Sequence, residues 1–122
     1  MNVSRVILLL PFLSLAACSR DAEVMEFVKE NDETVKAVAA AADVATARTA
    51  WDAHKESLKT KAKGMADIRG FQVKEETMSA MAKSVMDGGM KICSLQIKHM
   101  SDADGGAGFK AICDEYTDGL KM

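Results

Sequence analysis

Five residues in the second half of the chain carry side chains that bind soft metal ions. Met78 and Met81 are three residues apart, and Met86 and Met90 are four apart, so each pair would occupy adjacent turns of a helix. His99 follows closely in the sequence. Thioether sulfur selects Cu(I), and imidazole also binds copper. These residues therefore form a candidate metal site.

Methionines at helical spacing are also typical of a protein core, because their flexible side chains fill irregular gaps. This interpretation is favoured here, and a metal site is kept as the alternative. The spacing is similar to that of methionine-rich periplasmic copper carriers, which implies copper as the metal. A second form of the alternative is haem held without a covalent bond by Met25 and His99. Such a site would resemble the helical bundles of b-type cytochromes, and no Cys-x-x-Cys-His attachment sequence is present.

The residues needed for catalysis are sparse. The chain has two histidines and no Gly-x-Ser-x-Gly sequence, so no nucleophilic triad is recognisable. The glycine-containing segment 104–108 lacks the lysine pattern of a phosphate-binding loop. Asp102 and Asp104 do not have the calcium-loop spacing, and we expect them to cap helices. We expect a non-enzymatic protein with no catalytic residues.

Trp51 is the only tryptophan. We expect it to anchor the core, and the alternative is an exposed contact for a binding partner. His54 falls on the same helical stripe, where a packed histidine is the usual finding.

These side chains must be positioned by helices. Alanine, methionine, lysine and glutamate dominate, and proline is absent after Pro11. No stretch alternates as a strand does. The sequence predicts an all-α fold, a small antiparallel bundle of three to four helices. The expected helices are 21–42, with a possible break at 31–32; 44 to about 63 or 66, with Asp43 as N-cap; 73–100; and 107–120.

Apolar residues at spacings near 3.6 predict the buried face of each helix. These faces comprise Val24, Val28, Asn31, Val35, Val38 and Ala42; Val44, Ala47, Trp51, His54, Leu58, Ala62 and Met65; Met78, Met81, Val85, Ile92 and Leu95, widened by Met86, Met90, Cys93 and Ile97; and Phe109, Ile112, Cys113, Tyr116 and Leu120. Gly88 and Gly89 in the third helix predict a kink or a close helix approach. The alanine run 39–42 predicts close packing or a corner.

The first 18 residues carry a separate signal. A short basic segment precedes the apolar run 6–15, which is shorter than the roughly 20 residues of a transmembrane helix. Leu15-Ala16-Ala17-Cys18 resembles the lipobox of bacterial lipoproteins. The resemblance implies cleavage before Cys18, a diacylglyceryl group on its sulfur and, usually, acylation of the new amino group. The expected parts are a signal peptide (1–17), a lipidated tether (18–23) and a helical domain (24–122). The alternative is an ordinary cleaved signal that leaves a free Cys18.

The remaining two cysteines are placed for a disulfide. Cys93 and Cys113 each lie ten residues from Ala103, the centre of the predicted loop. In an antiparallel helix hairpin these positions stand at the same height, and a disulfide needs Cα atoms about 4.4–6.8 Å apart. We expect a disulfide between the third and fourth helices in an oxidising compartment, with two buried free thiols as the alternative.

The net charge and the expected cellular location limit the functions to be considered. The net charge is −2, and removal of residues 1–17 takes one of the 16 basic residues and none of the 18 acidic ones, giving −3. This balance does not favour nucleic acid. The lipoprotein resemblance, with Ser19 rather than Asp after the cysteine, implies the outer membrane. We expect a lipid-anchored envelope protein that binds another envelope protein or serves as an accessory module. The alternative is a periplasmic helical bundle that binds copper or haem.

Overall fold

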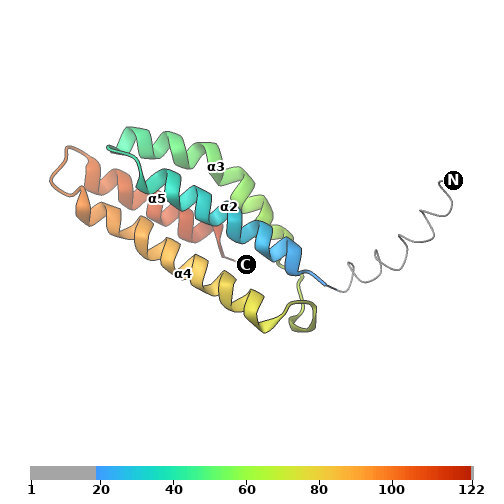
Figure 1. Cartoon of the computed structure of the whole chain (residues 1–122). Helices are drawn as coiled ribbons and strands as arrows, with labels where there is room; N and C mark the ends of the chain where they lie inside the picture. The colour runs from blue at the N-terminus through green and yellow to red at the C-terminus, as the bar shows by residue number, and fades with distance from the viewer. Residues whose placement is uncertain (1–18, 122) are drawn as a thin grey trace.

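The computed structural model describes residues 19–121, which form a bundle of four α-helices (Figure 1). The helices are α2 (Asp21–Ala39), α3 (Val44–Gly64), α4 (Glu75–Lys98) and α5 (Gly105–Gly119), and a short 3-10 helix, η1 (Gly70–Gln72), precedes α4. The described part of the chain contains no strand, so the predicted all-α fold is confirmed. Within that part, no helix combines the length and apolar character needed to cross a membrane.

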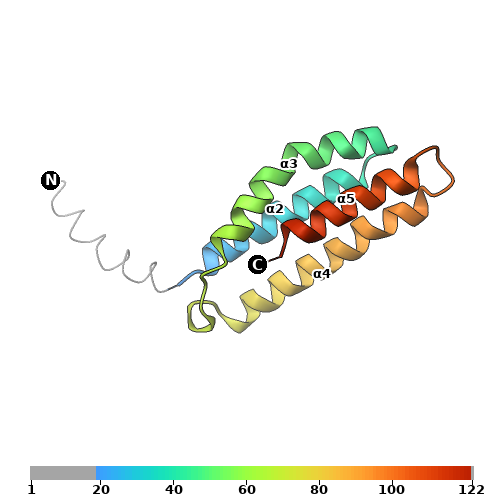
Figure 2. The same ribbon diagram turned by 180° about the vertical axis from the view of Figure 1, so that it is seen from behind.

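The four helices pack in the cyclic order α2, α3, α5, α4. Consecutive helices run in opposite directions, as expected, but the neighbours α2 and α4 are parallel (Figures 1 and 2). Their direction is fixed by contacts at two levels: the Arg20 amide donates to the Gln72 carbonyl at one end, and Asn31 bonds Ser84 further along. The connection from α3 to α4 therefore crosses the bundle end diagonally.

Large side chains fill the centre of the bundle. The Trp51 and Tyr116 rings meet edge to face, with centroids 6.0 Å apart. Phe27 and Phe109 are also fully buried. Each of the four helices supplies residues to this core, which is completed by Val24, Val28, Val35, Val38, Ala47, Leu58, Ala62, Met65, Val73, Ile92, Leu95 and Ile112.

Several helix ends differ from the expected ones. Helix α2 ends at Ala39 rather than residue 42, and the remaining alanines form the corner before α3. Asp43 is the N-cap of α3, as predicted, and its carboxylate accepts from the Thr46 amide at 2.8 Å. Helix α4 begins at residue 75 rather than 73, and α5 begins two residues early, at Gly105. Helix α2 begins at Asp21, the residue at which the first helix was expected to begin.

The alternative of a break at residues 31–32 is not found, and α2 is one continuous helix, as the main expectation had it. Asn31 is fully buried because other helices satisfy its amide, as described below. Helix α4 is likewise continuous across Gly88 and Gly89. Of the two expectations, a close approach of another helix is correct at Gly88. A Cβ atom on Gly88 would lie 2.6 Å from the Tyr116 hydroxyl.

The predicted disulfide between Cys93 in α4 and Cys113 in α5 is confirmed. Their Cα atoms are 4.9 Å apart, and the bond joins positions 20 residues apart in sequence. The two cysteines stand at the same height because α4 and α5 are adjacent, antiparallel and joined by a short loop.

The widened inner face predicted for α4 is wrong at three positions. Met86, Met90 and Ile97 are about two-thirds exposed. At 100° per residue they lie on the side of α4 opposite Gly88 and Ile92, which are buried. Only one face of α4 can contact α2 and α5, so this second apolar row is left at the surface.

Candidate functional site

The structure does not bring the five candidate metal ligands together. Met78 and Met81 lie near the start of α4, whereas His99 follows its end. At 1.5 Å per residue, Met78 and His99 are about 30 Å apart along the helix. Met86 and Met90 lie on the exposed face between them. A single site that uses all five residues is therefore excluded.

The Met25 and His99 pair is separated for the same reason. Met25 lies in the first turns of α2, at the end of the bundle where α4 begins, and it is 44 % exposed. Because α2 and α4 are parallel, His99 lies at the opposite end. These two side chains cannot ligate one haem iron in this fold.

His99 instead closes the end of α4. Its Nδ1 lies 2.7 Å from an Asp102 carboxylate oxygen, and its ring stacks on Phe109 with centroids 4.5 Å apart. Its Nε2 is buried without a hydrogen-bond partner among the described residues. These contacts join the α4–α5 loop to the core.

Trp51 is fully buried, so it cannot be the exposed partner contact considered as an alternative. Its indole N–H donates to a Glu115 carboxylate oxygen at 3.0 Å, and Arg48 pairs with the same carboxylate at 2.8 Å. Burial acts to raise the pKa of Glu115, but the Trp51 and Arg48 hydrogen bonds outweigh it and hold the pKa below its usual value. Cys18, the expected lipidation site, lies outside the described residues.

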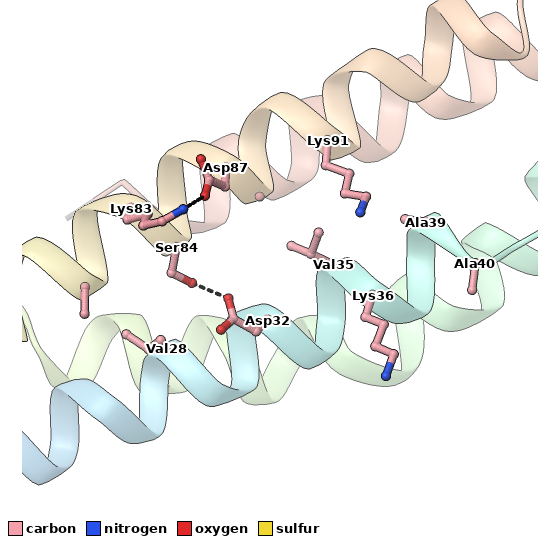
Figure 3. Close-up of a pocket in the computed structure, with 12 residues that line it drawn as sticks. Val28, Asp32, Val35, Lys36, Ala39, Ala40, Lys83, Ser84, Asp87 and Lys91 are labelled. Atoms are coloured by element: carbon pink, nitrogen blue, oxygen red, sulfur yellow. Dashed lines mark hydrogen bonds and ion pairs between the residues drawn. The ribbon is translucent and has the colours of Figure 1, made fainter.

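A groove lies between the parallel helices α2 and α4 (Figure 3). It encloses about 810 Å³. Small and apolar side chains predominate along it, Lys91 of α4 reaches toward α2, and Lys36 of α2 extends away from α4 (Figure 3). The lining residues are Val28, Asp32, Val35, Lys36, Ala39 and Ala40 from α2 and its end, and Ala80, Lys83, Ser84, Asp87, Gly88 and Lys91 from α4.

A buried polar network fixes the two helices beneath the groove. The Asn31 amide nitrogen donates to the Ser84 hydroxyl at 2.9 Å and to the Ser84 carbonyl at 3.1 Å. Tyr116, from α5, donates its hydroxyl to the Asn31 amide oxygen at 2.7 Å. Ser84 in turn donates to an Asp32 carboxylate oxygen at 2.6 Å (Figure 3). Every polar side chain of this network has a partner, which sets a single register between α2 and α4.

Burial in this network also changes the pKa of the Tyr116 hydroxyl. Burial raises the pKa of Tyr116 to about 12, and the negative charge of nearby Asp32 acts in the same direction. Tyr116 is therefore a neutral hydrogen-bond donor at physiological pH.

Charge is unevenly distributed along the groove. Lys83 and Asp87 form an ion pair one helical turn apart. Lys36 and Lys91 lie near the other end, and neither forms an ion pair with another described residue. Figure 3 shows Lys91 reaching from α4 toward α2. This end of the groove therefore offers cations without an acidic partner.

The groove combines small and apolar side chains with charged ones. Within residues 19–121, no cluster of three or more His, Cys, Asp or Glu side chains is arranged to hold a metal ion. Apolar side chains, small residues and unpaired cations are features that receive an amphipathic helix. Sequence reasoning missed this groove, although Asn31 on an apolar stripe and Gly88 in a helix were signals of it.

Comparison with known proteins adds no family to this description: no family model, curated protein or solved structure matches the chain.

Proposed function

We propose that this protein is a lipid-anchored envelope protein that binds a helical segment of a partner protein in the groove between α2 and α4. The observation that carries the proposal is the groove itself, with an apolar floor held open by a satisfied polar network. A preformed floor lowers the entropy that binding must overcome.

The lining defines the chemistry of the partner segment. Ala39 and Ala80 are small, so the backbone of a docked helix can approach closely. Val28 and Val35 offer apolar contacts to alternate turns of such a helix. Lys36 and Lys91 favour acidic residues beside its apolar stripe. The partner segment is therefore an amphipathic helix with an acidic flank.

The anchor part of the proposal rests on the lipobox resemblance of residues 15–18. Each buried methylene of an acyl chain contributes about 0.8 kcal/mol, and stable attachment takes about two chains. A diacylglyceryl group on Cys18 would therefore hold the protein at a membrane without a transmembrane helix. Ser19 in place of Asp after this cysteine supports the outer membrane.

Photo-crosslinking in cell envelopes tests the groove. A photoreactive amino acid replaces Ala80, which lines the groove, or Ala53, which is exposed on α3 as a control. We expect an adduct from position 80 only, and we expect Lys91→Glu to weaken it. The crosslinked peptide should be an apolar helix with acidic neighbours. Equal adducts from both positions, or none, would contradict the proposal.

Fractionation tests the anchor. Cys18→Ala should move the protein from the membrane fraction to the soluble fraction or leave it as an unprocessed precursor. The intact precursor mass and the mass of the diacylated protein distinguish these forms. A wild-type protein found at the membrane with an unmodified Cys18, as shown by its mass, would exclude a lipid on this cysteine.

A further inference from the structure

A second, smaller pocket lies at the end of the bundle where α2 and α4 begin. It encloses about 220 Å³ and is lined by six residues. Three of them are methionines that the fold gathers from α4 and the turn after α3: Met65, Met78 and Met81. The other three, Val24, Ala66 and Ile68, are apolar.

The three methionines differ in their access to solvent. Met65 is 5 % exposed and belongs to the core, Met81 is half-buried, and Met78 is 40 % exposed. Met78 and Met81 lie one turn apart on α4, so both can face one pocket. The pocket therefore runs from the surface at Met78 inward to Met65, which gives a ligand a route of entry.

We propose that Met65, Met78 and Met81 form a thioether site for Cu(I). The side chains that line the pocket present no nitrogen or oxygen atom, so sulfur is the only side-chain donor available. Soft thioether ligands select Cu(I), whereas Mg²⁺ and Ca²⁺ require oxygen ligands. The three rotatable bonds of methionine allow sulfur atoms on separate segments to converge on one ion.

One cation near the pocket is already paired with acidic side chains. Arg20 lies 2.6 Å from Glu23 and 3.1 Å from Asp67. These two acids adjoin Val24 and Ala66, which line the pocket. The guanidinium charge is thus already balanced by carboxylates.

This site has a different and smaller set of ligands than the one predicted from spacing in the sequence. It keeps Met78 and Met81, adds Met65, and leaves out Met86, Met90 and His99, which lie elsewhere on the fold. Met65 had been placed only in the core. It becomes a ligand candidate because the turn after α3 carries it to the first turns of α4.

The test is an anaerobic titration of the full chain in detergent. Cu(I) is kept reduced by ascorbate, which leaves the disulfide intact, and the protein competes with a coloured Cu(I) chelator. Met78→Leu is the main variant because this side chain is partly exposed and leucine keeps its size. Met86→Leu with Met90→Leu is the matched control, since it removes two thioethers outside the pocket.

We expect the wild type to take up one Cu(I) more than Met78→Leu does, or to bind it at least about tenfold more tightly, as for loss of a metal ligand. The control should match the wild type. Ag(I), a redox-inert substitute, should shift the methyl resonances of Met65, Met78 and Met81 and leave those of Met86 and Met90 unchanged. Absence of a difference between wild type and Met78→Leu, or an equal loss in the control, would overturn the site. Neither result bears on crosslinking in the groove.

Discussion

Gly88 offers the sharpest test of how the helices are packed. A Cβ atom added at this position would lie 2.6 Å from the Tyr116 hydroxyl, 2.9 Å from a Val35 methyl and 3.3 Å from the Asn31 amide nitrogen. All three atoms belong to buried side chains on two other helices. Gly88→Ala must therefore push α2 and α5 away from α4 or break the polar network.

The change in the free energy of unfolding caused by Gly88→Ala is the sum of opposing contributions. Overpacking a dense core costs about 1–3 kcal/mol. Moving the Tyr116 hydroxyl would also leave the buried Asn31 amide oxygen without a donor, at a cost of about 1–3 kcal/mol. Replacing a helical glycine by alanine returns about 1 kcal/mol. We expect Gly88→Ala to lower the free energy of unfolding by about 1–5 kcal/mol, which lowers the Tm by about 5 °C or more in a domain of this size.

Gly89 is the matched control one position along the same helix. The nearest atom to a Cβ on Gly89 is 4.0 Å away, an ordinary contact. Gly89→Ala should therefore stabilise the protein by about 0.5–1 kcal/mol, the opposite sign from Gly88→Ala. In a Tyr116→Phe background the closest clashing atom is gone, so Gly88→Ala should cost less there by about 0.5 kcal/mol or more.

Urea and thermal unfolding followed by circular dichroism at 222 nm would measure all of these variants with the disulfide intact. The reasoning fails if Gly88→Ala is as stable as the wild type, or if the two alanine variants shift stability equally. Additivity of Gly88→Ala and Tyr116→Phe would also refute the contact between them.

Three further outcomes are expected. Tyr116 is the only tyrosine, so the absorbance change at 295 nm reports ionisation of its phenol alone. The midpoint of this titration should lie near pH 12 in the folded protein and near pH 10 in urea. Because the neutral phenol is favoured in the fold, its contribution to stability is complete below pH 10 and is lost as pH rises toward 12, and urea midpoints across this range should fall accordingly. Cys93→Ser with Cys113→Ser should lower the free energy of unfolding by about 3 kcal/mol in urea titrations, since the bond closes a loop across 20 positions. Asp43→Ala should cost about 1 kcal/mol in the same assay because the Thr46 amide loses its cap, whereas Asp43→Asn should cost less.

Local signals in the sequence were enough to predict the helices and the disulfide. Asp43 is a strong N-cap and predicted the start of α3, whereas the exposed Ala42 lies at stripe spacing, so the end of α2 was predicted three residues late. The pairing of Cys93 with Cys113 could be predicted because two helices joined by a short loop pack antiparallel. These features depend on neighbours in sequence, which periodicity and loop length describe.

The groove and the methionine pocket depend on which helices are neighbours, and local patterns do not determine this. The α3–α4 connection crosses the bundle end, which places α2 beside α4 rather than opposite it. Met86 and Met90 were predicted to be buried for the same reason. Helix α4 has two apolar rows, and the sequence does not show which row packs against the other helices. The arrangement of the bundle selects the row that contains Ile92.

The buried network explains why one arrangement is selected. An apolar side chain at position 31 would pack against α4 in several registers, but Asn31 is satisfied only where Ser84 and Tyr116 both reach it. Leaving its amide unpaired in the core would cost about 1–3 kcal/mol for each lost partner. Gly88 then allows the Tyr116 hydroxyl to come within reach. The residues that specify the register are thus the ones that form the base of the groove. Variants that disturb the network should therefore weaken crosslinking from position 80 even where the bundle still folds.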